Sequence, residues 1–224
     1  MTRVREIAGP AGRLEALLEE PPDHGGVNAE GLVERGRAVG LRAAVVLAHP
    51  HPQYGGSMHT KVVYQAAKAF ARIGCAVLRF NFRGVGTSEG SWDEGRGEMD
   101  DFRAGVAFMR EQYPNVRVWA AGMSFGAWIA MTVGAQEDVV STLIGIAPPV
   151  SRFDFDVVCT TEKPKFFIQG ERDELCPLKD MQDFYARARH PKELAVIDGA
   201  DHLFDGKVLE VADAIDDLLG DWTA

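Results

Sequence analysis

The feature that most constrains the fold is an apolar run that passes through the pentapeptide Gly122-Met-Ser-Phe-Gly126 into a helix-compatible segment. Residues 116–121 are mostly apolar and favour β-structure, so we predict a buried strand there. Residues 127–135 are compatible with a helix. A serine therefore lies at the apex of a strained turn. Glycines are required on both sides because a β-carbon would clash where strand and helix approach closely.

The rest of the chain alternates between two kinds of element. Short apolar or β-favouring runs predict strands at 3–7, 12–19, 42–49, 75–82, 140–147, 165–169 and 193–197. Periodic apolar positions predict helices at about 60–73, 97–113, 178–189 and 206–219. Residues 12–19 can also be interpreted as a helix, and the polar segment 27–39 is left unassigned.

Strands that alternate with helices form β-α-β units, and such units give a parallel sheet covered on both faces. We therefore predict an α/β fold with a mostly parallel sheet of about seven to eight strands. No internal repeat or linker is evident, so one domain over residues 1–224 is the simplest interpretation.

Composition excludes several classes of protein. The chain is 46% hydrophobic and 25% charged, as is usual for a globular protein, and its net charge of −9 argues against nucleic acid or an anionic membrane as partner. No apolar run approaches a membrane span, and the N-terminus lacks a signal-peptide core. The three cysteines, Cys75, Cys159 and Cys176, fit reduced thiols, so we expect a cytoplasmic protein. The oligomeric state stays open, a homodimer included.

An acid and a histidine follow later strands. Asp173 comes after the strand at 165–169, and His202 comes after the strand at 193–197. Because the carboxyl ends of parallel strands meet at one edge of a sheet, we expect both to lie near Ser124. A serine hydroxyl needs a base, which a histidine supplies, and an aspartate holds the other imidazole N–H. The order Ser124, Asp173, His202 is that of a nucleophile-elbow triad.

A triad of this kind needs two N–H donors for the oxyanion. We expect one from the Phe125 amide at the helix N-terminus. The other should come from the loop after the strand at 43–48. His51 is the only donor between Pro50 and Pro52, with Gln53 and Tyr54 as reserves.

Several of these residues have alternative interpretations. The alternative for Asp173 is a purely turn-forming role, as for the acids beside it. The alternative to His202 as base is His190, but it precedes a proline on the wrong side of its strand. His49 and His51 have metal-ligand spacing but no acidic or cysteine partners, so we favour a loop-shaping role and expect no metal.

Two further features also have simpler interpretations. The run Arg83-Gly-Val-Gly-Thr-Ser-Glu-Gly90 lacks the features of a phosphate loop, so a structural turn that braces the site is favoured. For Cys176, a packed thiol is favoured over a redox role.

Taken together, these motifs resemble the α/β-hydrolases, in particular the small, cap-less bacterial serine hydrolases and carboxylesterases related to dienelactone hydrolase. The resemblance is carried by the segments His49-Pro-His-Pro52 with Gly55-Gly56, Phe80-Asn-Phe-Arg-Gly-Val-Gly-Thr-Ser88, Gly122-Met-Ser-Phe-Gly126, Gly170-Glu-Arg-Asp173 and Asp201-His202. Dienelactone hydrolase itself has a cysteine nucleophile, so its substrate does not carry over to Ser124. About 18 residues separate the strands at 140–147 and 165–169, which is too few for a lid domain.

The expected activity is hydrolysis of a small or medium carboxylic ester, without a cofactor, through an acyl-serine. Thioester or peptide/amide cleavage uses the same residues and stays open, as does a non-catalytic binding module on this fold. We expect the pocket walls to come from residues 50–59, residues 148–155 and the surroundings of Trp92.

Overall fold

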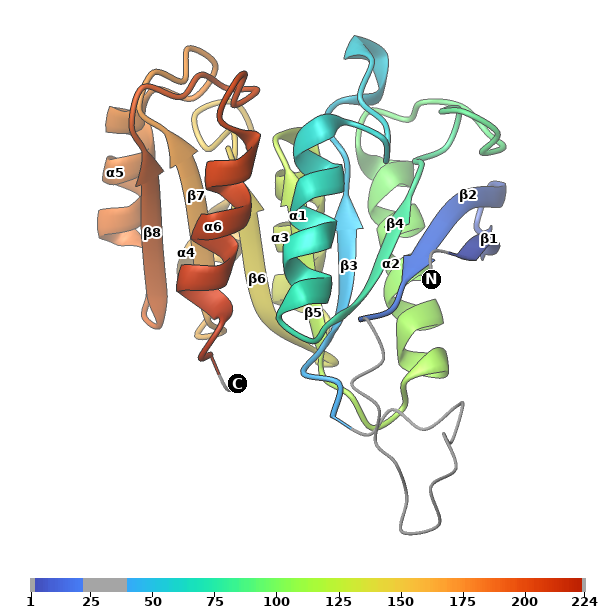
Figure 1. Ribbon diagram of the computed structural model, residues 1–224. Coiled ribbons are helices and arrows are strands. Elements are labelled where there is room, and N and C mark those ends of the chain that lie inside the picture. Colours follow the sequence, from blue (N-terminus) through green and yellow to red (C-terminus); the bar gives the residue numbers. More distant parts are fainter. Residues whose placement is uncertain (1–2, 22–39, 223–224) are drawn as a thin grey trace, which may run out of the picture.

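The computed structural model describes residues 3–21 and 40–222 (Figure 1). The segment 27–39, unassigned from the sequence, lies outside these residues. Within the described ranges, eight strands form one sheet in the order β1-β2-β4-β3-β5-β6-β7-β8. The strands are β1 (Arg3–Gly9), β2 (Gly12–Glu19), β3 (Ala44–Ala48), β4 (Ala76–Phe80), β5 (Val118–Met123), β6 (Val140–Ile146), β7 (Lys165–Gly170) and β8 (Lys192–Ile197).

The sheet is mixed but mostly parallel, as predicted. β1 pairs with β2 and β2 with β4 in antiparallel fashion, whereas β3 to β8 run parallel. The segment 12–19 is therefore a strand and not a helix. Because the strands from β3 to β8 share one direction, the loops after them all emerge at one edge of the sheet (Figure 1).

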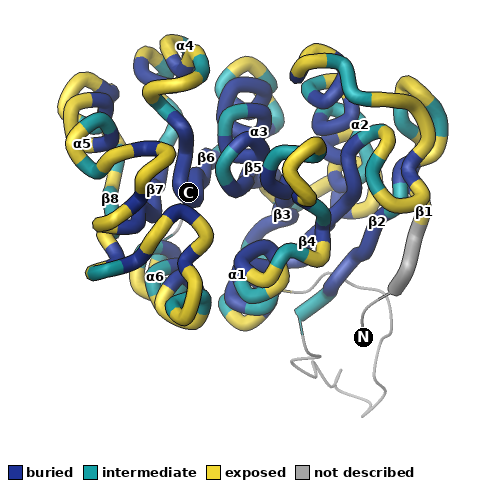
Figure 2. The backbone as a smooth tube through the Cα atoms, turned by 90° about the horizontal axis from the view of Figure 1, so that it is seen from above, coloured by how far each residue is buried: buried dark blue, intermediate teal, exposed yellow. Residues whose placement is uncertain are grey.

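Helices cover both faces of the sheet. Figure 2 shows α1 and α6 on one side and α2, α3, α4 and α5 on the other. The helices are α1 (Lys61–Arg72), α2 (Arg96–Gln112), α3 (Phe125–Gln136), α4 (Asp156–Thr160), α5 (Leu178–Arg187) and α6 (Val208–Leu219). Phe70 and Ile215 belong to the core under the first pair, and Phe102, Ile129 and Phe184 belong to the core under the others. β3 and β5 are buried along their whole length, as central strands of such a sheet must be.

Several boundaries differ from the predicted ones for identifiable reasons. α6 begins at Val208 and not at residue 206, since Gly206 has φ +72°, which a right-handed helix does not allow. β4 ends at Phe80: Asn81 N still donates to Glu15 O of β2 at 2.8 Å, but Phe82 N turns to the His49 ring at 3.1 Å. The structure also adds a short 3₁₀ helix at Pro52–Tyr54.

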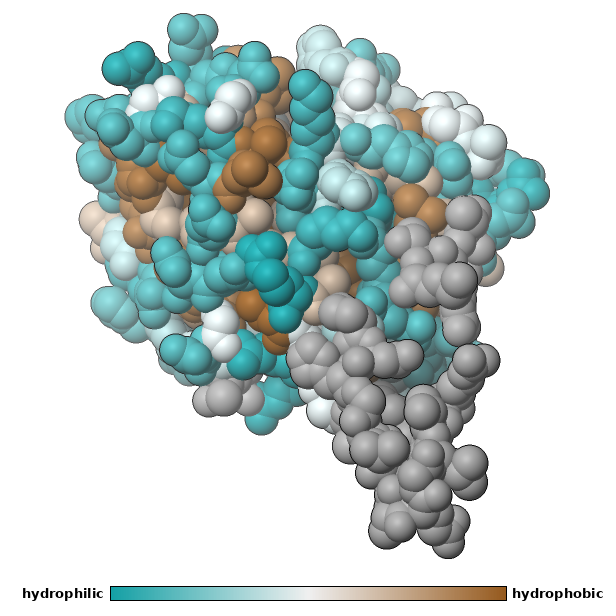
Figure 3. All heavy atoms as spheres, in the orientation of Figure 1, coloured by the Kyte–Doolittle hydropathy of each residue, from teal (hydrophilic) through white to brown (hydrophobic). Residues whose placement is uncertain are grey.

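The connection between β6 and β7 carries only the five-residue helix α4 and no lid. The face shown in Figure 3 is largely polar, with apolar side chains between polar ones. Val196, Leu203 and Leu209 are among the exposed large apolar residues. No helix in the described part of the chain is long and apolar enough to cross a membrane.

Candidate active site

Ser124 lies in a sharp turn between β5 and α3. Its backbone has φ +52° and ψ −122°, a left-handed conformation that non-glycine residues seldom adopt. A Cβ on Gly122 would lie 2.2 Å from the carbonyl oxygen of Gly126, and a Cβ on Gly126 would lie 2.4 Å from that of His49. The close approach predicted for both glycines is therefore confirmed. The turn presents the serine hydroxyl at the carboxyl edge of the sheet.

The structure brings Ser124, His202 and Asp173 into one chain of hydrogen bonds. Ser124 Oγ lies 2.8 Å from His202 Nε2, and His202 Nδ1 lies 2.8 Å from Asp173 Oδ2. Because Oδ2 accepts, the proton of a neutral ring belongs on Nδ1, which leaves Nε2 to accept from the serine. His202 and Asp173 are 7% and 4% exposed, so little water competes for these bonds.

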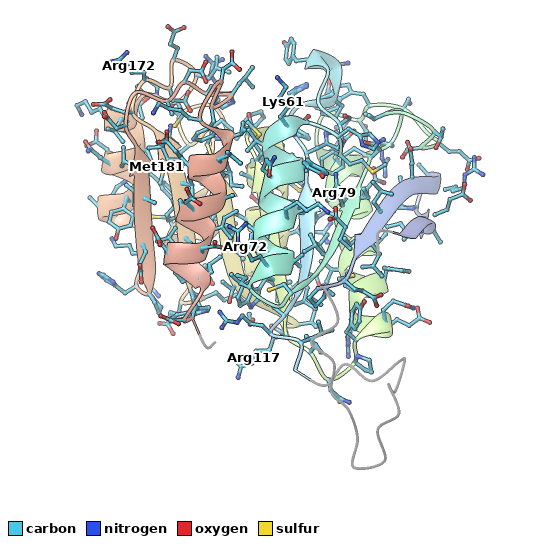
Figure 4. The ribbon with its side chains drawn as sticks, viewed as in Figure 1. Lys61, Arg72, Arg79, Arg117, Arg172 and Met181 are labelled. Atoms are coloured by element: carbon cyan, nitrogen blue, oxygen red, sulfur yellow. The ribbon has the colours of Figure 1, made fainter. Side chains whose placement is uncertain are left out.

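The two loops that carry the acid and the histidine are hydrogen-bonded to each other. Arg172 N donates to Ala200 O at 2.8 Å, and Glu171 N donates to Ile197 O at 3.0 Å. Figure 4 shows Arg172 at this edge of the sheet, whereas Arg117, which precedes β5, lies at the opposite edge. The spacing between Asp173 and His202 is thus set by backbone bonds.

Asp173 accepts hydrogen bonds on both carboxylate oxygens. Leu175 N and Cys176 N each donate to Oδ1 at 2.8 Å, and Gln169 Nε2 donates to Oδ2 at 2.9 Å. Gln169 was not among the residues predicted from the sequence. Its only sequence signal is a polar residue near the end of an otherwise apolar buried strand.

Two backbone N–H groups near Ser124, those of Phe125 and His51, have no hydrogen-bond partner within the described ranges. Phe125 begins α3, whose first amides have no intrahelical acceptor. Both reserve donors are engaged: Gln53 N donates to His51 Nδ1 at 3.2 Å, and Tyr54 N donates to His51 O at 3.1 Å. Of the three candidates in this loop, only His51 keeps its amide unpaired.

His49 holds this loop from beneath. Its fully buried ring accepts from Phe82 N on Nε2 at 3.1 Å and donates from Nδ1 to Pro50 O at 2.6 Å. Burial lowers the pKa of His49 to about 4, so the ring is neutral. These contacts agree with a loop-shaping role.

The loop after β4 braces the same region. Asn81 Nδ2 and Thr87 N both donate to Glu15 Oε2, at 2.8 and 3.0 Å, and Asn81 Oδ1 accepts from Met58 N at 2.8 Å. The bond from Thr87 N is the main cause that lowers the pKa of Glu15. Arg83 pairs with the buried Asp101 at 2.7 Å. These contacts support a structural turn, and the roles of Glu15 and Asp101 were not identified from the sequence.

Aromatic rings surround the residue that follows the serine. The buried Phe125 ring has centroid distances of 4.9 Å to His51, 5.2 Å to Trp92 and 5.6 Å to Trp128. Phe153 stacks on Trp128 at 4.4 Å. Of the half-buried rings, His51, Trp92 and Phe153 come from the regions expected to form pocket walls, whereas Trp128 belongs to α3.

Around this site, the residues that the structure describes offer no cluster of metal ligands, and the cysteine that contacts Asp173 is buried. No group of three or more His, Cys, Asp or Glu residues that is suited to a metal ion occurs in the described part of the chain. The three cysteines are free and buried. Burial raises the pKa of the Cys176 thiol to about 11, as for a packed thiol.

Comparison with known proteins identifies the family. The chain belongs to the Hydrolase_4 family, described as serine aminopeptidase, S33, whose model matches residues 40–153. It is therefore an α/β serine hydrolase by family. The matched segment includes Ser124 but ends before Asp173 and His202.

Individual relatives agree with this assignment. An uncharacterized protein of Rickettsia prowazekii (strain Madrid E) is 37% identical over 199 residues, 85% of this chain and 83% of the relative. An α/β serine hydrolase homologue from Coxiella burnetii is 33% identical with a TM-score of 0.85, covering 97% of each chain. A lidless α/β serine hydrolase from Xanthomonas campestris is also 33% identical, with a TM-score of 0.84 over 96% of this chain and 92% of that one. The predicted α/β-hydrolase fold without a cap is confirmed, while the relation to dienelactone hydrolase stays a prediction.

Proposed function

We propose that this serine hydrolase cleaves carboxylic esters with a small or medium acyl chain through an acyl-Ser124 intermediate. One observation carries the proposal: the unbroken hydrogen-bond chain from Ser124 Oγ through His202 to Asp173, with both contacts at 2.8 Å. The two unpaired amides of Phe125 and His51 support it, because an oxyanion needs such donors.

In the acylation step, Ser124 Oγ attacks the ester carbonyl carbon while its proton passes to His202 Nε2. The carbonyl oxygen gains negative charge and is stabilised by the N–H groups of Phe125 and His51. The C–O bond to the alcohol then breaks, and His202 returns the proton to the departing oxygen. The buried Asp173 carboxylate stabilises the imidazolium between these transfers.

In the deacylation step, a water molecule takes the place of the alcohol. His202 accepts a proton from the water as it attacks the acyl carbon, and the same two amides hold the oxyanion. The Ser124–acyl bond breaks, the serine recovers its proton from His202, and the carboxylic acid is released. No cofactor is required by this cycle.

Two features favour an uncharged ester with a modest acyl group. The rings of His51, Trp92 and Trp128 around Phe125 offer an apolar surface, which suits a hydrocarbon chain better than a charged group. The β6–β7 connection adds only a five-residue helix above the sheet, so long chains find little further surface to bury.

The test is turnover of p-nitrophenyl acetate and p-nitrophenyl butyrate by the parent and by Ser124→Ala. Triad chemistry predicts a loss of two or more orders of magnitude in kcat for the variant. Ser141→Ala, at the start of β6 and so at the opposite edge of the sheet, is the matched control and should keep parental activity. Equal activity of parent and Ser124→Ala would overturn the proposal.

Peptide or amide cleavage is the second candidate, favoured by the family's description as serine aminopeptidase. Thioester cleavage uses the same residues. Rates on aryl-ester, aminoacyl-arylamide and acyl-CoA substrates, measured side by side, distinguish the three. A fluorophosphonate probe that failed to label Ser124 would instead favour a non-catalytic binding module.

A further inference from the structure

Gln169, the second-to-last residue of β7, is fully buried against the acid of the proposed triad. Its Nε2 donates to Asp173 Oδ2 at 2.9 Å and to Cys176 O at 2.8 Å. Both partners are oxygens, and this fixes the orientation of the amide, since the reverse orientation would place its own oxygen against them.

The other end of the Gln169 amide is unsatisfied. Its Oε1 is buried and has no hydrogen-bond partner among the residues that the structure describes. A buried acceptor without a partner is destabilising. A fully apolar side chain would avoid this cost. The presence of a glutamine here is therefore best explained by the N–H donor that its amide supplies.

That donor shares an oxygen with the histidine. Asp173 Oδ1 accepts from Leu175 N and Cys176 N, whereas Oδ2 accepts from both Gln169 Nε2 and His202 Nδ1. A neutral donor on Oδ2 spreads the negative charge of the carboxylate and fixes its plane. It thereby weakens the attraction of Oδ2 for a protonated imidazole.

We propose that Gln169 is a positioning residue that, through Asp173 Oδ2, both orients His202 and limits its basicity. This inference rests on the proposed function, in which His202 is the base. The amide keeps His202 from being held in the protonated form, in which it cannot accept the serine proton.

Several other titratable groups lie around the Asp173–His202 pair. Cys176 faces Asp173 as a thiol, its pKa raised by burial to about 11, and Asp180 at the start of α5 lies beyond it. On the loops and helix nearby, Glu171 accepts from Gly199 N, Asp201 accepts from Leu203 N and Asp205 N, and Lys207 pairs with Glu210.

The experiment compares the parent with Gln169→Met, which keeps the length but removes the donor, and Gln169→Glu, which keeps the shape but adds an ionisable group. Gln182→Met, on the exposed surface of α5, is the matched control. Two quantities are followed: kcat and KM for p-nitrophenyl acetate between pH 5 and 9, and the NMR titration of the His202 ring in a Ser124→Ala background.

For Gln169→Met we expect the acidic limb of kcat/KM and the His202 titration to move up by about half a pH unit, roughly the worth of one neutral hydrogen bond. We expect kcat to fall about tenfold with KM nearly unchanged. For Gln169→Glu, the midpoints of the acidic limb of kcat/KM and of the His202 titration should both move up further, because the new carboxyl adds negative charge beside a protonated ring. Gln182→Met should match the parent.

Unchanged midpoints in both folded Gln169 variants would overturn the inference and leave Gln169 as a packing residue. If Gln169→Met fails to fold, the same two midpoints are measured for the isosteric Gln169→Glu, and their movement decides the question. The NMR titration needs no turnover. Failure of the proposed function, shown by an inactive parent with an unlabelled Ser124, is therefore distinguishable from failure of this inference.

Discussion

The buried ring of His49 accepts a hydrogen bond from the backbone N–H of Phe82 at 3.1 Å and so ties the loop that carries His51 to the end of β4. The same ring donates to Pro50 O at 2.6 Å. A protonated ring has no acceptor and loses the first bond. The shape of this loop, and with it the position of the His51 amide, therefore depends on His49 remaining neutral.

His49 should make the fold sensitive to acid. Burial lowers its pKa from 6.5 to about 4, so between these values the unfolded chain binds a proton that the folded chain does not. Stability must then fall as the pH falls from 6.5 to 4, by up to roughly 3 kcal/mol. Urea unfolding at pH 7.0 and pH 4.5 measures this loss.

The comparison with His49→Gln isolates this contribution from that of other groups. The variant is expected to be less stable at pH 7 but to lose less further stability at pH 4.5 than the parent does. His190→Gln, at an exposed loop position, should retain the parental pH dependence. If His49→Gln and the parent show the same dependence, the ring does not titrate as described.

The rate of ester hydrolysis should fall at acidic pH, because a protonated imidazole cannot accept the serine proton. The measurement is kcat/KM for p-nitrophenyl acetate from pH 4 to 9. Far-UV circular dichroism at each pH shows whether the protein is still folded, so that acid unfolding is not mistaken for loss of the base. A flat profile down to pH 4 would rule out His202 as the base.

Gly126→Ala should disrupt the turn at Ser124. The added Cβ would lie 2.4 Å from His49 O and 2.7 Å from Ala48 O, backbone atoms that cannot move without displacing β3. We expect a loss of roughly 3 kcal/mol or more, typical of overpacking against rigid neighbours, together with loss of esterase activity.

Gly206→Ala is the control for this substitution. Gly206 has φ +72° with nothing within 4 Å of the added Cβ, so its cost is only the left-handed conformation, about 1 kcal/mol. Thermal unfolding of both variants measures the difference. Equal stabilities would mean that the close approach at Gly126 is easily relieved.

Glu19→Gln should destabilise the protein strongly. Arg79, only 2% exposed, donates from Nε to Glu19 Oε1 at 3.0 Å, and the change leaves its charge buried without a counter-ion. Breaking a buried pair in this way costs about 3–5 kcal/mol. The exposed Glu6–Arg13 pair is the control, and Glu6→Gln should cost less than about 1 kcal/mol in urea unfolding.

Most of the architecture was predictable from local patterns. Alternating strands and helices imply a parallel sheet, and a parallel sheet places the residues after its strands at one edge. Ser124, Asp173 and His202 could therefore be expected to lie together before any distance was known, and the structure joins them by bonds of 2.8 Å. The clash at Gly122 was also predictable, since it arises within one turn, whereas the clash at Gly126 involves the backbone of Ala48 and His49 at the end of β3.

Only the tertiary structure decided which polar groups meet across the chain. Glu15 reaches Asn81 because β2 pairs antiparallel with β4, an order that no local pattern specifies. The choice of His51 over Gln53 and Tyr54 depends on the turn that engages the other two amides. Gln169 contacts Asp173 only because the loop after β7 folds back over the strand end. Residue spacing determines which elements form, whereas hydrogen-bond partners depend on distances of about 3 Å that are set only once those elements pack.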